Sequence, residues 1–134
     1  MGPFLYCLAT ADFEILPGVT ACTFADDTAF LASHSDPQVA VDMIQSQLHL
    51  FHEWCDRWKI RVNPQKSVNV NFTLNRGTVP ALEYNGNPVP VKESVRYLGL
   101  HIDSKLNWKE HVKKKHKQTK LSLLKLNWVL RPGS

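Results

Sequence analysis

The chain has 134 residues, of which 43% are hydrophobic and 21% are charged, a composition typical of a globular domain. Its three cysteines lie far apart without C-x-x-C spacing, which argues against a zinc site or a disulfide framework and favours a reduced, intracellular setting. No run is apolar for long enough to span a membrane, and no basic segment precedes the apolar stretch near the N-terminus. We therefore expect neither a membrane anchor nor a signal peptide.

Charge is unevenly distributed along the chain. Residues 1–104 carry seven Lys/Arg and eleven Asp/Glu, a net charge of −4, whereas residues 105–134 carry nine Lys/Arg and one Glu, a net charge of +8. A basic C-terminal segment attached to an acidic remainder predicts contact with a polyanion. A solvated helix face is the alternative that the charges alone leave open.

The first predicted elements are a short helix over residues 4–15 and a β-hairpin. Residues 19–25 and 28–33 are rich in β-branched and aromatic types, so we expect two buried strands. Asp26 and Asp27 lie between them, and two residues are the length of a tight hairpin turn. The pattern predicts two adjacent carboxylates at a hairpin tip.

A long amphipathic helix follows. Asp36 as the N-cap and Pro37 in the first turn mark its start. Apolar residues then recur at three- and four-residue steps as far as Trp58, and we expect this helix to pack across the back of the hairpin. Alternating apolar and polar residues over 67–73 predict a half-buried strand.

The last predicted elements are short strands and a basic helix. The Asn-Gly pair at 85–86 is a strong hairpin signal. Apolar alternation over 95–102 changes phase near Gly99, which predicts a β-bulge. A second long helix begins at Asn107, where Glu110 completes a capping-box pattern. Little of the chain remains to cover its apolar stripe, which indicates that further partner structure packs there.

Asp26 and Asp27 are the leading candidates for a functional site. Two adjacent carboxylates repel each other and gain most when a divalent cation binds them. Mg²⁺ prefers oxygen ligands and is commonly held by one or two carboxylates plus substrate phosphates, the arrangement that two-metal phosphoryl transfer uses. Ordinary turn chemistry also accounts for an Asp-Asp pair, so the two residues by themselves leave both interpretations open.

Four motifs occur in a definite order and cover most of the chain. The run from Thr23 to Ala32 contains Phe24-Ala25-Asp26-Asp27, similar to a [YF]-x-D-D signature. It is followed by W-C-D-R-W-K-I-R-V-N-P-Q-K-S at 54–67, V-R-Y-L-G-L-H-I-D at 95–103 and L-N-W-K-E-H-V at 106–112. Together they resemble the reverse transcriptases of non-LTR (LINE-type, jockey-like) retrotransposons, in which the later motifs lead from a catalytic lysine to the primer grip and the start of the thumb.

The resemblance implies roles for individual residues. Asp26 would be the main metal ligand, and Asp27 a secondary one that helps to position the metal or the primer terminus. Lys66 would neutralise charge or donate a proton near the outgoing pyrophosphate, with a plain loop lysine as the alternative.

Two further groups would handle the nucleic acid. The primer grip, which supports the primer end in attack geometry, would be Tyr97, Leu98 and Gly99. Lysines of the basic helix would contact template–primer phosphates and give salt-dependent, sequence-independent affinity; they are Lys113, Lys114, Lys115, Lys117 and Lys120.

The fold implied by the resemblance is α+β. Residues 1–104 would form a partial polymerase palm, an antiparallel sheet with helices packed on one face, and residues 105–134 the first basic thumb helix. The implied cofactor is Mg²⁺ or Mn²⁺. The implied partners are an RNA template, a DNA primer and, in the complete enzyme, a deoxynucleotide, with no membrane and no disulfide partner. The expected setting is cytoplasmic or nuclear, without secretion.

One required ligand has no counterpart in the sequence. Reverse transcriptases need another carboxylate from an upstream strand and fingers that bind the incoming nucleotide, and Asp12 and Glu14 do not match that ligand. We therefore expect a polymerase fragment that is inactive in isolation. The alternatives are a non-catalytic relic that binds nucleic acid through its basic helix, and an ordinary α+β interaction domain, against which the motif order argues.

Overall fold

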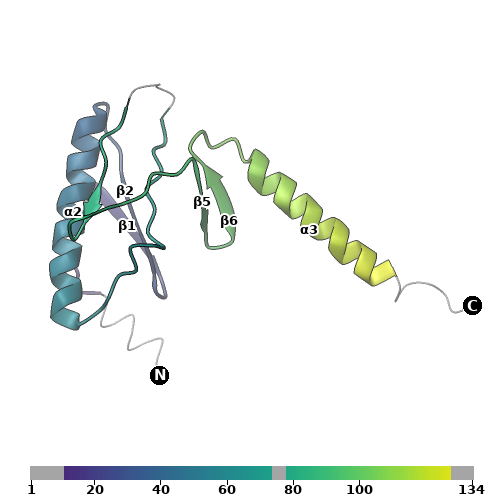
Figure 1. Cartoon of the computed structure of the whole chain (residues 1–134), viewed down its shortest axis with the longest axis horizontal. Coiled ribbons are helices and arrows are strands. Elements are labelled where there is room, and N and C mark those ends of the chain that lie inside the picture. The colour runs from purple at the N-terminus through teal and green to yellow at the C-terminus, as the bar shows by residue number, and fades with distance from the viewer. Residues whose placement is uncertain (1–10, 74–77, 128–134) are drawn as a thin grey trace, which may run out of the picture. The chain divides into compact units, whose positions relative to one another are not determined.

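The computed structural model describes residues 11–73 and 78–127. These residues fall into two compact units, 11–69 with 78–91 and 70–73 with 92–127. Each unit combines short antiparallel strands with one long helix (Figure 1). The predicted mixture of helices and antiparallel strands is therefore confirmed, but the described strands form three separate two-stranded sheets and not the single predicted antiparallel sheet.

The first unit contains the predicted hairpin, made of β1 (Val19–Phe24) and β2 (Asp27–Ala32). The prediction that both strands are buried is wrong, because Val19 alone among their residues is buried and Phe24 and Leu31 are more than half exposed. Its register pairs Phe24 with Asp27, so the two turn residues are Ala25 and Asp26, with Ala25 at a φ of 51°. The prediction that Asp26 and Asp27 form the turn is thus wrong by one residue, and Asp27 begins β2. The register is decided by packing, because a slip of one residue would turn Phe30 away from the helix that it contacts.

Helix α2 (Pro37–Trp58) starts where the sequence predicts. The Asp36 carboxylate accepts a hydrogen bond from the Gln38 N–H at 2.9 Å, as an N-cap does. The ring of Phe51 lies 5.2 Å from that of Phe30 in β2, which confirms that α2 packs on the hairpin (Figure 1).

An aromatic cluster forms the core of the first unit. The rings of Phe13, Phe30, Phe51 and Trp54 have contacting centroids between 5.2 and 6.1 Å apart. Trp54 is 6% exposed and its neighbour Cys55 is 1% exposed. Aromatic pairs of this kind add about 0.5–1.5 kcal/mol each beyond simple burial.

Two glutamines of α2 hold irregular backbone against the helix. The Gln47 amide, which is fully buried, donates to the Glu14 carbonyl and accepts from the Leu16 N–H, both at 2.8 Å. The Gln45 amide pairs in the same way with the N–H and the carbonyl of Glu83, both at 2.9 Å. A side-chain amide carries both a donor and an acceptor, so it can substitute for a neighbouring strand.

These contacts correct the prediction of a helix over residues 4–15. Residues 11–12 form a turn and residues 13–15 have no regular secondary structure, and residues 4–10 lie outside the described residues. This irregular segment is stabilised by Gln47 and by the Trp54 indole N–H, which donates to the Asp12 carboxylate at 2.8 Å. Tertiary hydrogen bonds thus override the local helical pattern.

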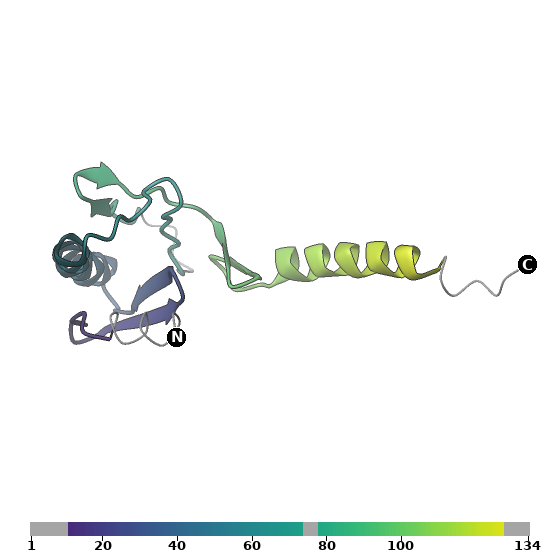
Figure 2. The same ribbon diagram turned by 90° about the horizontal axis from the view of Figure 1, so that it is seen from below.

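A second hairpin lies on another side of α2 (Figure 2). Strands β3 (Glu83–Tyr84) and β4 (Asn87–Pro88) are joined by Asn85 and Gly86, whose φ values are 49° and 72°. Two successive positive φ values define the turn that an Asn-Gly pair favours, so this predicted hairpin is confirmed.

The predicted strand over 67–73 is wrong. In this segment the structure has a single parallel bridge, between Asn69 and Val91, and the Asn69 N–H donates to the Pro90 carbonyl at 2.9 Å. Pro88 and Pro90 have no N–H to donate, so this side of the pairing cannot extend into a regular ladder.

The second unit consists of β5 (Ser94–Tyr97), β6 (Leu100–Asp103) and α3 (Lys109–Asn127). Tyr97 pairs with Leu100, and the two residues between them, Leu98 and Gly99, have φ values of 46° and 82°. The predicted bulge near Gly99 is therefore wrong, because the change of phase in the apolar pattern marks a two-residue turn.

The surface of α3 is open along its length. Residues 112–126 are all exposed, and its apolar members Val112, Leu121, Leu123, Leu124 and Leu126 are at least 52% exposed. The predicted stripe of this helix consists of Trp108, Val112, Thr119, Leu123, Leu126 and Leu130. Its first five residues are exposed, as expected for an uncovered stripe, and Leu130 lies outside the described residues. Neither helix described in 11–73 and 78–127 is long and apolar enough to cross a membrane.

We predict that Gln47→Leu lowers the free energy of unfolding by about 1–3 kcal/mol, because the Leu16 N–H and the Glu14 carbonyl lose their buried partner. Urea denaturation measures this change. Gln38→Leu is the matched control, since Gln38 is exposed on the same helix and should change stability by less than about 0.5 kcal/mol. Equal effects of the two substitutions would contradict the role given to Gln47.

Candidate functional site

The two aspartates lie at the tip of the β1–β2 hairpin. Asp26 is in the turn and Asp27 is the first residue of β2, and both are exposed. Neither carboxylate forms an ion pair or a hydrogen bond with another side chain in the described part of the chain, so both are open to a cation. Phe24, opposite Asp27, is 64% exposed, which leaves an apolar side chain uncovered at the same tip.

The hairpin fits a hard divalent cation as a partial site. It offers two carboxylates, and Mg²⁺ commonly takes one or two of them and completes its shell with water and phosphate oxygens. The described residues contain no cluster of three or more His, Cys, Asp or Glu side chains that could hold a metal by themselves. Asp12 has a structural partner, because its carboxylate accepts the Trp54 indole hydrogen bond.

Lys66 lies in an exposed turn after α2. The Asn63 side chain accepts a hydrogen bond from the Gln65 N–H at 3.0 Å, and the Asn63 carbonyl accepts from the Lys66 N–H at 3.2 Å. This Asx-type turn fixes the backbone at Lys66 and leaves its ammonium group in solvent. Lys66 and the two aspartates belong to the first unit, while the other predicted site residues belong to the second.

The predicted primer-grip residues form the end of the β5–β6 hairpin. Tyr97 is half-buried, Leu98 is 47% exposed, and a side chain built on Gly99 would meet nothing within 4 Å. Leu98 and Gly99 both have positive φ values, a conformation that glycine adopts readily and that is costly for leucine.

The lysines of α3 form the basic surface of the second unit. Lys113, Lys115, Lys117 and Lys120 are exposed. Lys114 differs because its ammonium pairs with the Glu110 carboxylate at 2.6 Å and lies 3.3 Å from His101 Nδ1. Desolvation and the neighbouring Lys114 charge lower the pKa of His101, so this end of the helix favours the neutral imidazole.

Asp103 is a residue whose role the sequence does not reveal. Its carboxylate accepts hydrogen bonds from the N–H groups of Lys105, Asn107 and Trp108 at 3.0–3.1 Å. These bonds, with that of Asn107 foremost, lower the pKa of Asp103. The predicted Asn107–Glu110 capping box is replaced by this arrangement: α3 begins at Lys109, and Glu110 pairs with Lys114.

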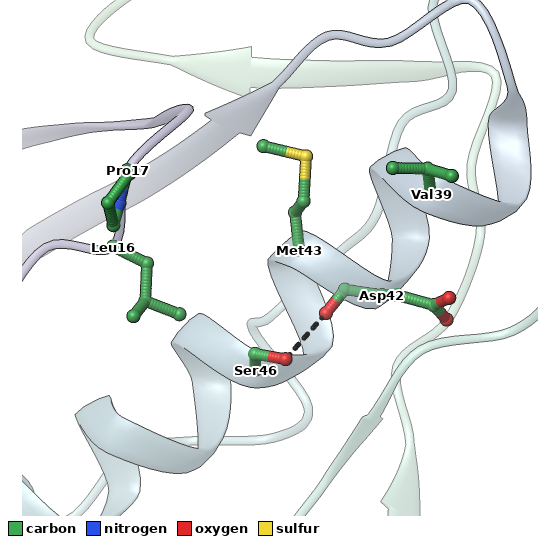
Figure 3. Close-up of a pocket in the computed structure, with 6 residues that line it drawn as sticks. All are labelled: Leu16, Pro17, Val39, Asp42, Met43 and Ser46. Atoms are coloured by element: carbon green, nitrogen blue, oxygen red, sulfur yellow. Dashed lines mark hydrogen bonds between the residues drawn. The ribbon is translucent and has the colours of Figure 1, made fainter.

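A groove of about 310 Å³ lies beside α2, and none of the predicted site residues lines it (Figure 3). It is lined by Leu16 and Pro17 and, from the helix, by Val39, Asp42, Met43 and Ser46. Met43 extends across it toward the segment before β1, and its terminal methyl occupies the space that a Cβ on Gly18 would need. The groove is therefore part of the packing between this segment and α2. Among the described residues, Cys22 is exposed, Cys55 is buried and the two form no disulfide, and Cys7 lies outside the described residues.

Comparison with known proteins defines the class. The family model for reverse transcriptase (RNA-dependent DNA polymerase) matches residues 1–102. The RNA-directed DNA polymerase from mobile element jockey of Drosophila melanogaster is 28% identical, over 98% of this chain and 15% of its own length. The probable RNA-directed DNA polymerases from transposon X-element and transposon BS of the same species are 35% and 33% identical, over 97% of this chain and 15% and 16% of their lengths.

The chain belongs to the reverse transcriptase family, because the family model covers most of it. The predicted resemblance to the jockey-like retrotransposon enzymes is confirmed. The chain spans about 15% of the length of these curated relatives. No solved structure matches it.

We predict that the turn held by Asp103 weakens in acid. Because the folded-state pKa of Asp103 is lowered, its stabilisation is fully present above the unfolded pKa of about 3.9 and is lost as the pH falls through the folded value. The amide ¹H shifts of Asn107 and Trp108 should titrate with a midpoint below about 3.9, and Asp103→Asn should abolish the titration. A midpoint at or above the unfolded value would contradict this account.

Proposed function

We propose that the chain is part of an RNA-directed DNA polymerase of a non-LTR retrotransposon and that Asp26 and Asp27 hold a divalent metal at its polymerisation site. The observation that carries the proposal is an exposed Phe-Ala-Asp-Asp hairpin in a chain that the reverse transcriptase family matches over residues 1–102. The parent protein would act inside the cell.

The chemistry assigned to this hairpin is electrostatic. A bound Mg²⁺ or Mn²⁺ would stabilise the attacking and leaving oxygens of nucleotidyl transfer. Asp26, in the turn, would be the main ligand, and Asp27, at the start of β2, the secondary one. The packing of Phe30 on Phe51 holds the hairpin against α2, so the two carboxylates are presented by a fixed backbone. The remaining protein ligand would come from sequence that these 134 residues do not contain.

Further roles in the same reaction follow from the family. Lys66 would neutralise or protonate the outgoing pyrophosphate. The turn formed by Leu98 and Gly99, next to Tyr97, would support the primer end. Residues 1–104 would be the partial palm and residues 105–134 the first thumb helix, with RNA template, DNA primer and deoxynucleotide as ligands of the complete enzyme.

The lysines of α3 would bind the template–primer duplex. Lys113, Lys117 and Lys120 are spaced four and three residues apart, so they share one face of the helix, and all three are exposed. Lys115 lies on another face, and Lys114 is engaged with Glu110. A non-catalytic chain that binds nucleic acid through this helix is the second candidate function, and the open basic surface of α3 is the observation that favours it.

We predict that the 134-residue chain does not extend a primer on an RNA template with Mg²⁺, because the further carboxylate ligand and the fingers that the family implies have no counterpart in it. In the complete parental polymerase, Asp26→Asn should lower primer extension by at least about 10²-fold, the scale on which one electrostatic stabiliser acts. Glu53→Gln, on the exposed side of α2, is the control and should leave extension unchanged. Full extension by Asp26→Asn would remove Asp26 from the mechanism.

We also predict that reversing Lys113, Lys117 and Lys120 to Glu flattens the salt dependence of duplex binding. The slope of log K against log[salt] should fall by about 0.9 for each phosphate that the helix no longer neutralises, as measured by fluorescence anisotropy. Reversing Lys59, Arg61 and Lys92 makes the same change in net charge outside α3 and serves as the control. Equal slopes for the two triple variants would make α3 a solvated face.

A further inference from the structure

The connection between β6 and α3 has an unusual backbone. Leu106 and Trp108 have positive φ values of 52° and 59°, a conformation that costs residues with a side chain. Both belong to the segment whose amides the Asp103 carboxylate binds, one oxygen taking Lys105 and Asn107 and the other taking Trp108. The Leu106 N–H donates in turn to the Asp103 carbonyl at 2.9 Å. One residue therefore fixes the whole path from the strand to the helix.

A second set of contacts joins the first turn of α3 to β6. His111 Nδ1 accepts a hydrogen bond from the backbone N–H of His101 at 3.2 Å. The ring of His111 also lies 6.2 Å from that of Trp108, edge to face, and 6.2 Å from that of His101. Glu110 hydrogen-bonds Ser94 of β5 as well as Lys114.

Beyond this first turn, α3 is exposed, and residues 112–126 show no buried position. The direction of the helix relative to the hairpin is thus decided near residues 103–111. Each helical residue advances about 1.5 Å, so a tilt of about 20° at Lys109 would move Lys120 by roughly 6 Å, comparable with the spacing of phosphates. Small changes at the connection would misplace the basic face.

We propose that Asp103 and His111 are positioning residues that lock α3 to the β5–β6 hairpin, so that the basic face of α3 and the Leu98–Gly99 turn engage one primer–template duplex in a fixed register. Neither residue touches the reacting atoms. This inference rests on the proposed function, because it assumes that both surfaces bind the same duplex.

The lock is tested on the ¹⁵N-labelled 134-residue chain by residual dipolar couplings, without any nucleic acid. In the native chain, the amides of 94–103 and of 109–126 should fit a single alignment tensor. Asp103→Ala and His111→Ala should each give two different tensors, and Asp103→Asn, which keeps one acceptor oxygen, should be intermediate. Glu93→Ala removes an exposed carboxylate of the same unit and should keep one tensor. A single tensor in both Asp103→Ala and His111→Ala would overturn the lock.

The proposed role of this lock in nucleic-acid binding is tested by measuring how tightly the chain binds a duplex with a recessed 3′ end and a blunt duplex of equal length. The native chain should prefer the recessed end, and Asp103→Ala should lose that preference while keeping the salt slope that the lysines produce. Glu93→Ala should strengthen binding to both duplexes equally, because it removes a negative charge near a polyanion. A preference that survives Asp103→Ala, or one that the native chain never shows, would overturn this part of the inference.

These two measurements separate the inference from the proposed function. If the native chain binds neither duplex, the nucleic-acid role of α3 fails together with the purpose of the lock, whereas the alignment data still decide whether Asp103 and His111 hold the helix. If the chain binds both duplexes with the expected salt slope but Asp103→Ala leaves one tensor and the same preference, only the inference fails.

Discussion

The first unit depends on side chains of α2 that replace the hydrogen bonds of missing regular structure. Gln47 is fully buried and satisfies the backbone of the segment before β1, and Gln45 does the same for β3. Without these amides, extended backbone would lie against a helix with unpaired polar groups, which is costly. The aromatic rings that surround Phe51 then hold the β1–β2 hairpin on the same helix. The carboxylates at the hairpin tip are positioned by this framework although no part of the framework contacts them.

In the second unit, α3 is held to the rest of the described residues near its first turn, and residues 112–126 are exposed. Asp103 organises the connection, and His111 ties the first turn of α3 to β6. The remainder of α3 carries exposed lysines and leucines that are more than half exposed. Exposed lysines are well solvated, whereas four exposed leucines within six residues form an apolar surface of the kind that commonly marks an interaction site.

Local signals are sufficient where short-range chemistry decides the structure. Asp36 caps α2, the Asn-Gly pair makes its hairpin, and the periodic apolar residues mark both long helices. These signals fail where residues distant in the sequence decide the local structure. Hydrogen bonds from Gln47 and Trp54 keep residues 11–15 from forming a helix. Pro88 and Pro90, shortly before the residue that pairs with Asn69, prevent a regular strand ladder.

A two-residue turn and a β-bulge both change the phase of the apolar alternation along a strand. The sequence therefore does not distinguish them at Leu98 and Gly99, where the structure has a turn. Asp103 cannot be found from the sequence, since its importance lies in three backbone contacts. The two aspartates can be found, because the motif around them is specific.

Metal binding by Asp26 and Asp27 at the tip of the β1–β2 hairpin is the proposal on which the assigned chemistry depends. The most direct test is a titration of the ¹⁵N-labelled 134-residue chain with Mn²⁺, whose paramagnetism broadens nearby amides even when binding is weak, as expected for a site with two protein ligands. We expect selective broadening of the amides from Phe24 to Thr28, which should be lost when Asp26 and Asp27 are both changed to Asn and retained in Asp42→Asn. Broadening spread evenly over exposed carboxylates, or unchanged in the double variant, would contradict it.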